Sequence, residues 1–308
     1  MKNSKKLLCV ITGPTACGKT DLTIQLAKEY NTHIISADSR QFYKQLIIGA
    51  ATPSANQLAI VPHYLIGQLS VEDSYNVYKF EQDALALCET LFQSHNIVFL
   101  TGGSGLYIDA ACKGIDLLPD PDLEIRNSIN TLFEEQGIEA LQTKLQALDP
   151  IYYSNVDKLN PARLIRAIEV CLQTGKPYSS LRNQHQNSRP FNILKIVIDR
   201  PKEILHQRIS QRTEQMIKDG LIDEVKSLIK FRNVNALNTV GYKEIFQYLD
   251  EAISLPQAIE NIKTNTRRYA KRQLTWFRRD KDFLWINADE LNTIKSIIET
   301  NLGNSPSL

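Results

Sequence analysis

Short apolar runs alternate with amphipathic stretches over the first third of the chain. Runs of this kind predict strands over residues 7–11, 33–36, 97–100 and, later in the chain, 191–198. Between them, apolar residues at helical spacing predict helices over 19–30 and 76–95. Strands that alternate with helices are typical of a parallel sheet that is covered on both faces. We therefore expect an α/β fold.

The pattern changes after residue 121. From 122 to 181 the apolar spacing is helical and is interrupted only by turns rich in Gly and Pro, which indicates a helical insertion. Residues 201–277 are again mostly helical, and 283–286 predict a last edge strand. The length of 308 residues allows about two domains. We expect an α/β core built from 1–121 and 186–308, a helical insertion over 122–185, and a frayed tail over 303–308.

Positive charge is concentrated in one segment near the end of the chain. The net charge of the whole chain is only +2, but residues 263–281 carry eight positive side chains and one negative side chain. This segment therefore has a net charge of +7, and the rest of the chain has a net charge of −5. Such a basic segment is typical of a protein that binds a polyanion.

The cysteines and the apolar runs argue against a secreted protein or a membrane protein. The five cysteines are odd in number and include no Cys-x-x-Cys pair, which argues against a disulfide framework or a zinc ribbon. No apolar run approaches the roughly 18–20 residues of a membrane-spanning helix. The run over 7–11 is also too short for the core of a signal peptide. We expect a cytoplasmic protein with no membrane contact.

One motif indicates a specific chemistry. Residues 13–20 match the pattern G-x-x-x-x-G-K-[ST] and lie between a predicted strand and a predicted helix. The N–H groups of such a loop surround phosphate oxygens, the helix N-terminus adds partial positive charge, and the lysine adds a full charge. The hydroxyl that ends the motif is a ligand for Mg²⁺. The predicted phosphate-binding residues are Gly13, Pro14, Thr15, Ala16, Cys17, Gly18, Lys19 and Thr20.

With this motif, the expected fold becomes a P-loop NTPase-like parallel sheet core with a helical insertion domain and a helical C-terminal part. Enzymes of this class that transfer or hydrolyse a phosphoryl group usually carry an Asp at the end of a second strand. The strand over 97–100 runs instead into Thr-Gly-Gly-Ser, whereas the strand over 33–36 is followed by Ala37 and Asp38. Asp38 is thus a candidate ligand of a metal-bound water or a candidate base toward a second substrate, and its spacing leaves both roles open.

Taken together, the motifs resemble the bacterial form of the tRNA dimethylallyltransferases, also called tRNA isopentenyltransferases. The matching segments follow the order of that family and cover about residues 7–280; they are 13–20, 35–41 with Tyr43, Pro62-His63, 101–107, 160–163 with 166–170, Gly175-Lys176, Arg208 and Arg212 with Met216 and Gly220, 240–244, and Lys271-Arg272-Gln273 with Trp276. Cys17 and Ser104 replace the usual Ser and Thr of the family. Residues 47–53 lack an acid and a lysine that the family commonly shows there, and we assign no role to them.

The resemblance implies transfer of a prenyl group rather than a phosphoryl group. The donor would be dimethylallyl diphosphate, the acceptor would be N6 of adenosine 37 in the anticodon loop of tRNA, and Mg²⁺ at Thr20 would be the cofactor. Lys19 and Thr20 would stabilise the leaving diphosphate, Asp38 would be the base at N6, and Ser104 would be a second contact to the adenine. Arg208 and Arg212 lie four residues apart, so they share a helix face and would close over the diphosphate.

The resemblance also implies three groups of tRNA contacts. They are Asp38, Ser39, Arg40, Gln41 and Ser104 beside the catalytic loop; Arg126, Arg163, Leu164, Ile165, Arg166 and Ala167 in the insertion; and Arg268, Lys271, Arg272 and Gln273 in the basic segment. We expect Glu169 to pair with an arginine rather than to contact RNA, and we expect Trp276 and Phe277 to belong partly to the core. No protein partner is implied, and a monomer is expected.

Two other functions share part of this pattern. A nucleoside or nucleotide kinase would carry the same phosphate loop, a helical insertion and the paired arginines, but it would not need the basic segment. A non-catalytic RNA-binding NTPase switch would need the basic segment, but it gives no reason for Asp38 beside a Gly-Gly-Ser loop.

Overall fold

A computed structural model describes residues 6–182 and 187–303 and divides the chain into two compact units. The first unit contains the chain up to Cys112 and again from Arg189, and the second unit is Lys113–Ser188. The second unit begins at Lys113, earlier than the expected start at 122, because residues before 122 are hydrogen-bonded to a helix of that unit. Arg166 Nη2 donates to Pro119 O at 2.6 Å, and Gln173 Nε2 donates to Asp120 O at 2.9 Å.

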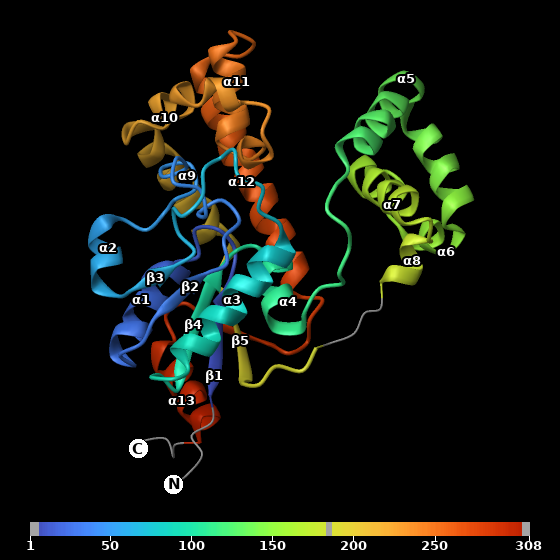
Figure 1. Cartoon of the computed structure of the whole chain (residues 1–308). Coiled ribbons are helices and arrows are strands. Elements are labelled where there is room, and N and C mark those ends of the chain that lie inside the picture. Colours follow the sequence, from blue (N-terminus) through green and yellow to red (C-terminus); the bar gives the residue numbers. More distant parts are fainter. Residues whose placement is uncertain (1–5, 183–186, 304–308) are drawn as a thin grey trace. The chain divides into compact units, whose positions relative to one another are not determined.

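The first unit is built on a parallel sheet. In the described part of the chain, six strands lie in the order β3-β2-β4-β1-β5-β6, and all neighbours are parallel (Figure 1). Their bounds are β1 Leu7–Thr12, β2 Ile34–Ser36, β3 His63–Tyr64, β4 Ile97–Gly102, β5 Asn192–Asp199 and β6 Phe283–Asn287. The strands predicted from the sequence are confirmed, including β6 at the edge. The strand β3 was missed, because two residues are too short to show a periodic pattern.

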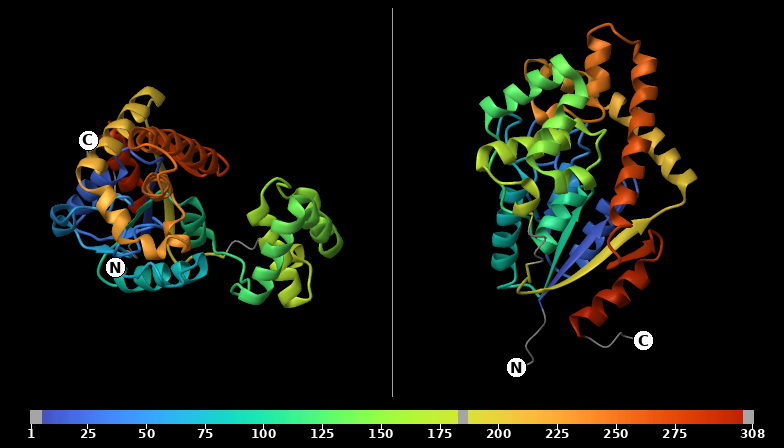
Figure 2. Two further views of the ribbon diagram at one scale, coloured as in Figure 1. Left: turned by 90° about the horizontal axis from the view of Figure 1, so that it is seen from above. Right: turned by 90° about the vertical axis from the view of Figure 1, so that its right-hand side faces the viewer.

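Helices cover both faces of this sheet, as the sequence predicts. Leu8 and Val10 of β1 belong to a hydrophobic cluster shared with α3, α4, α10, α11 and α12, whereas Leu7 and Cys9 belong to a second cluster shared with α1, α9 and α13. In the right-hand view of Figure 2, α3 in teal and α13 in red lie on opposite sides of the strands. Because both faces of β1 are buried, its sequence is an unbroken apolar run.

The helices of the first unit differ in length and include two short 3₁₀ turns. Their bounds are α1 Lys19–Glu29, α2 Ala55–Ile60, α3 Val77–Leu91, α4 Gly105–Lys113, α9 Lys202–Lys218, α10 Leu221–Ser227, η1 Ile229–Phe231, η2 Asn235–Leu237, α11 Tyr242–Leu249, α12 Leu255–Phe277 and α13 Leu291–Leu302.

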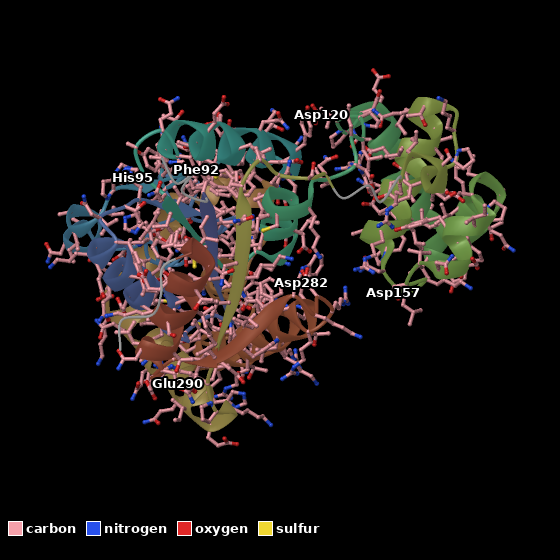
Figure 3. All side chains as sticks on the ribbon, turned by 90° about the horizontal axis from the view of Figure 1, so that it is seen from below. Phe92, His95, Asp120, Asp157, Asp282 and Glu290 are labelled. Atoms are coloured by element: carbon pink, nitrogen blue, oxygen red, sulfur yellow. The ribbon has the colours of Figure 1, made fainter. Side chains whose placement is uncertain are left out.

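Lys195 on β5 binds the turn between α12 and β6. Its Nζ lies 2.9 Å from an oxygen of Asp280 and 3.3 Å from one of Asp282, which is labelled in Figure 3.

The second unit is helical, as predicted, and has a hydrophobic core of its own. Its helices are α5 Leu123–Leu148, which is interrupted at Gly137, α6 Pro150–Asn155, α7 Pro161–Thr174 and α8 Tyr178–Leu181. Ile129, Leu141 and Leu145 of α5 pack against the buried face of α7. The predicted end of the insertion at 185 and most of the predicted tail over 303–308 lie outside the described residues.

The loops with candidate chemistry follow three neighbouring strands of the first unit. The phosphate loop follows β1, the segment with Asp38 follows β2, and the segment with Ser104 follows β4, which lies between those two strands. Because the strands are parallel, their carboxyl ends meet at one edge of the sheet. Ligand sites of open α/β sheets occur outside these carboxyl ends.

A buried ion pair lies in the first unit, at the point where the chain returns from the second unit. Arg189 Nη2 lies 2.7 Å from Glu81 Oε1, and the two side chains are only 7% and 5% exposed. The same guanidinium donates to the backbone oxygens of Ala110 and Ala111 at the end of α4. The arginine thereby fixes α3, α4 and the start of the returning chain to one another.

Replacing Arg189 with Met should destabilise the first unit by about 3–5 kcal/mol, because a buried carboxylate loses its adjacent cation. Urea unfolding followed by tryptophan fluorescence measures this unit, since Trp276 and Trp285 both belong to it. The matched control is Lys295→Met, which removes the more exposed ion pair with Glu29 and should change the free energy of unfolding by less than about 1 kcal/mol. A loss at Arg189 no larger than in the control would contradict the assignment.

Candidate active site

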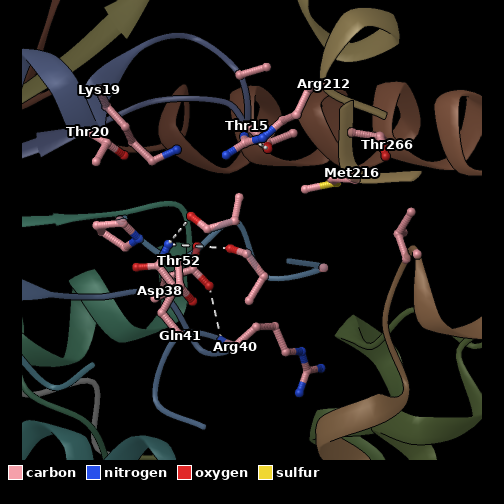
Figure 4. Close-up of a pocket in the computed structure, with 18 of the residues that line it drawn as sticks. Thr15, Lys19, Thr20, Asp38, Arg40, Gln41, Thr52, Arg212, Met216 and Thr266 are labelled. Carbon is pink, nitrogen blue, oxygen red and sulfur yellow. Dashed lines mark hydrogen bonds between the residues drawn. The ribbon is translucent and has the colours of Figure 1, made fainter. Parts of the chain in front are cut away.

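A pocket of about 720 Å³ opens at the carboxyl edge of the sheet. Figure 4 shows Thr15, Lys19 and Arg212 along one side of it and Asp38 with Gln41 across from them. Residues of α9 and α12 complete the lining. Residues predicted to bind the diphosphate therefore line one pocket with the predicted base, Asp38, although Arg212 is far from Asp38 in the sequence.

The phosphate loop is held in shape by arginines that bind its carbonyl groups. Arg208 Nε donates to Ala16 O at 2.7 Å, and Arg200 Nε donates to Cys17 O at 2.6 Å. Gly18, with a φ of 98°, makes the left-handed turn that leads into α1 at Lys19. Arg200 was not predicted, and its only signal in the sequence is its position just after β5, the strand beside β1.

The two arginines predicted to share a helix face both reach the phosphate loop from α9. Arg212 Nη1 lies 3.2 Å from Thr15 Oγ1, and Arg208 binds the loop carbonyl described above. Burial lowers the pKa of Arg212, and the negative charge of Asp38 opposes this shift. A guanidinium stays charged at physiological pH. Arg212 is therefore a poorly hydrated cation for which an anion in the pocket is a favourable partner.

Asp38 and Ser104 lie on the opposite side and are fixed by short local bonds. Asp38 Oδ1 accepts from the N–H of Arg40 at 3.0 Å, and Ser104 Oγ accepts from the N–H of Ser39 at 2.9 Å. The Ser104 hydroxyl also donates to Ser39 Oγ at 3.2 Å. The predicted base and the predicted adenine contact are thus brought together by the loops that follow β2 and β4.

Tyr269 on α12 belongs to the same cluster and was missed from the sequence. Burial, and to a smaller degree the charge of Asp38, raises the pKa of Tyr269 to about 12, while a hydrogen bond with Ser104 acts in the opposite direction. The phenol is therefore protonated at neutral pH and is available as a donor. Its only signal in the sequence is its place within the basic segment 263–281.

Gln273 lies one turn further along α12 and bridges the two sides of the site. Its Oε1 accepts from the N–H of Thr15, and its Nε2 donates to Gly103 O, both at 2.8 Å. The residue is only 6% exposed. Its amide group binds the phosphate loop and the loop after β4. Its contact with tRNA stays a prediction.

The other residues of the basic segment divide between surface and core. Arg268, Lys271 and Arg272 are exposed on α12, as an RNA contact requires. Phe277 is fully buried, and the partly buried Trp276 donates from Nε1 to Asp109 at 2.8 Å. The prediction that these two aromatic residues belong partly to the core is confirmed.

In the second unit, the predicted tRNA contacts have very different exposures. Arg163 is exposed and Ile165 is half-buried, but Leu164 and Ala167 are fully buried in the hydrophobic core, so their side chains do not reach the surface. Arg126 and Arg166 both bind Glu169 Oε2, at 2.6 and 2.7 Å. The expected pairing of Glu169 is confirmed, whereas contact of this unit with tRNA stays a prediction.

The donor groups in the pocket fit a magnesium ion that is shared with a phosphate ligand. Thr20 lines the pocket, and the described ranges contain no cluster of three or more His, Cys, Asp or Glu side chains placed to hold a metal ion. Mg²⁺ is commonly held by few protein groups and takes its other ligands from substrate phosphates and water. One hydroxyl beside a phosphate loop is consistent with that arrangement.

Two further observations concern the cysteines and the helices. All five cysteines are buried free thiols. Among residues 6–182 and 187–303, no helix combines the length and the apolar character that crossing a membrane requires.

Comparison with known proteins gives one consistent result. The family model of IPP transferases matches residues 41–280. The tRNA dimethylallyltransferase 1 of Bacteroides thetaiotaomicron is 48% identical over 302 residues, which is 98% of each chain. The tRNA dimethylallyltransferase of Christiangramia forsetii is 49% identical, over 91% of this chain and 93% of that relative.

Solved structures agree with the sequence relatives. The full-length tRNA isopentenylpyrophosphate transferase from Bacillus halodurans is 34% identical, covers 97% of each chain and superimposes with a TM-score of 0.71. The motif order, the sheet with its phosphate loop and these similarities all lead to one family. The chain belongs to the tRNA dimethylallyltransferases, the family of IPP transferases.

Proposed function

We propose that the protein transfers a dimethylallyl group from dimethylallyl diphosphate to N6 of adenosine 37 in tRNA. The bond between the allylic carbon and the diphosphate oxygen breaks, a bond between that carbon and N6 forms, and diphosphate leaves. Membership in the family supports this reaction. The observation that carries it is the pocket itself, in which a cationic phosphate loop faces a carboxylate across one space.

The side of the pocket with the phosphate loop would hold the diphosphate. As the carbon–oxygen bond breaks, negative charge grows on the leaving oxygen, and preorganised donors stabilise that charge. Lys19 and Arg212 line this side, and the partial burial of Arg212 strengthens its interaction with an anion. Arg208 and Arg200 contribute by holding the loop carbonyls, which keeps the loop in its phosphate-binding shape. Thr20 would hold Mg²⁺, which would supply further positive charge to the leaving diphosphate.

The opposite side would receive the adenine. Its amino group is a weak nucleophile, because the nitrogen lone pair is delocalised into the ring. Asp38 would accept the proton that N6 loses as the new bond forms. Ser104 and Tyr269 lie beside Asp38 and would orient the base. The nucleotide must leave the stack of the anticodon loop to reach this depth.

The rest of the tRNA would bind to exposed basic residues. Arg268, Lys271 and Arg272 on α12 are suited to phosphate contacts, and Arg163 on α7 is suited to them as well. We propose a monomer without a protein partner, since residues proposed for the diphosphate side and for the acceptor side line one pocket of the first unit. We place the reaction in the cytoplasm, where unmodified tRNA is available.

A direct assay separates this function from the nucleoside or nucleotide kinase. The protein should convert unmodified tRNA and dimethylallyl diphosphate into tRNA that contains isopentenyl-adenosine, detected by mass spectrometry of the nucleosides. With ATP and nucleosides or nucleotides it should show no phosphoryl transfer. Phosphoryl transfer without prenylation would refute the proposal and support the kinase.

The base assignment predicts a selective loss in Asp38→Asn. Turnover should fall by about 10²–10⁴-fold, the usual contribution of a general base. The dissociation constant of tRNA should stay close to that of the wild type, because the amide keeps the shape of the side chain and its bond from the Arg40 N–H. A matched control is Asp21→Asn, which changes another carboxylate of the same pocket and should leave turnover nearly unchanged. Near-normal turnover in the Asp38 variant would show that the base is wrong.

The proposed RNA surface predicts a strong dependence of binding on salt. The logarithm of the tRNA association constant should fall linearly with the logarithm of salt concentration, and Lys271→Ala should reduce the slope by about 1. Filter binding over a series of salt concentrations measures both values. The control is Lys226→Ala, which removes an exposed lysine of α10 outside the basic segment. If Lys271→Ala left the slope unchanged, α12 would not be part of the interface.

A further inference from the structure

Residues 47–53 form part of the pocket wall although they contain no catalytic group. Gly49, Ala50, Ala51, Thr52 and Pro53 all line the pocket. The segment lies outside helix and strand, and Ala51 has a φ of 49°, in the left-handed region that side chains other than glycine rarely adopt. A wall of this kind needs bonds from other elements to keep its shape.

One carboxylate supplies most of these bonds. Glu224 on α10 accepts from three successive N–H groups, those of Ile47 at 3.0 Å, Ile48 at 2.7 Å and Gly49 at 3.0 Å. The hydroxyl of Tyr242 donates to the same carboxylate at 2.7 Å. Hydrogen bonds to an ionised acceptor are stronger than those between neutral groups. The four bonds therefore bind the start of the segment firmly to α10 and α11.

Packing supports the same attachment. Tyr242 is fully buried, and Gly49 lies directly on its ring, so that a Cβ at position 49 would overlap the ring atoms. Glycine is required there by close approach. The ring of Tyr242 thus packs against Gly49, and the carboxylate of Glu224 binds the N–H groups of residues 47–49.

The middle of the segment, Ala50 and Ala51, is hydrogen-bonded to the side of the pocket that would receive the adenine. Gln41 Nε2 donates to the carbonyls of Ala50 at 3.4 Å and Ala51 at 3.2 Å, and its Oε1 accepts from the hydroxyl of Ser36 at 3.0 Å. The N–H of Gln41 donates to the backbone oxygen of Asp38 at 3.1 Å. A continuous set of hydrogen bonds therefore leads from Glu224 through residues 47–51 to Gln41 and the loop of Asp38.

We propose that Glu224 is a positioning residue for the acceptor side of the active site. Its carboxylate holds residues 47–49, which places the carbonyls of Ala50 and Ala51, and these carbonyls in turn hold Gln41 beside Asp38. The diphosphate side is built separately from the phosphate loop and α9. This inference rests on the proposed function for its kinetic consequence, but the hydrogen bonds of Glu224 can be tested without it.

The kinetic test compares Glu224→Ala with the wild type, with tRNA and dimethylallyl diphosphate varied in turn. In Glu224→Ala, kcat/KM for tRNA should fall by about 30-fold, while KM for dimethylallyl diphosphate stays within about threefold. Glu224→Gln should recover part of the loss, because its amide oxygen still accepts from two N–H groups. Tyr242→Phe keeps the ring on Gly49 and should reduce kcat/KM for tRNA only about threefold, as expected for one hydrogen bond.

The matched control is Asp223→Asn, which changes the neighbouring, exposed carboxylate of α10 and should leave both substrates unaffected. Wild-type kinetics in Glu224→Ala would overturn the proposal. A rise in KM for dimethylallyl diphosphate as large as the fall in kcat/KM for tRNA would also overturn it, since the diphosphate side would then depend on Glu224 as well.

Hydrogen exchange provides a readout that does not depend on activity. Amide exchange over residues 47–49 should become at least about tenfold faster in Glu224→Ala, while exchange in β1 and β4 is unchanged. Unchanged exchange over 47–49 would overturn the proposal. If the wild type transferred no prenyl group, the proposed function would fail, and exchange alone would then decide whether Glu224 holds this segment.

Discussion

The phosphate loop depends on the cations that bind its carbonyl oxygens. A loop whose N–H groups point toward a ligand must turn carbonyls the other way, and those carbonyls need partners of their own. Arg200, which directly follows β5, and Arg208 on α9 provide them. The anion-binding shape of a loop near the N-terminus therefore rests on residues almost 200 positions later in the chain. The phosphate-binding half of the site therefore combines residues that precede and residues that follow the insertion.

The acceptor half is assembled by a different means. Asp38, Gln41 and Ser104 lie in loops after two adjacent strands, and short hydrogen bonds between backbone and side chain fix them. Tyr269 and Gln273 approach from α12, which also carries the exposed basic residues. One helix thus contributes an inner face to the pocket and an outer face suited to a polyanion. That combination distinguishes the chain from a kinase, in which the nucleotide and its phosphate acceptor need no extended basic surface.

The sequence predicted the sheet well, because fully buried parallel strands are continuous apolar runs and because the phosphate loop marks the end of the central one. The family resemblance implied that Asp38 and Ser104 act beside the phosphate loop, and the structure brings them together because the carboxyl ends of parallel strands share an edge. The sequence did not predict Arg200, Tyr269 or Glu224. Their roles come from the tertiary fold: Arg200 binds a loop from a distant segment, the half-buried Tyr269 lines the pocket, and Glu224 accepts from backbone N–H groups, which the sequence does not reveal. Residues 47–53 were given no role because they lack an acid and a lysine common in the family; the structure shows that they contribute backbone atoms and small side chains to the pocket.

The helix α7 shows how one short motif can combine two requirements. Along residues 163–167, the exposed Arg163 alternates with Leu164 and Ala167, which belong to the hydrophobic core of the second unit. Leu164 and Ala167 therefore serve folding, whatever Arg163 contacts. A defective variant at Leu164 would have an unstable insertion, so Arg163 is the exposed position of this stretch at which a substitution changes the surface and leaves the core intact.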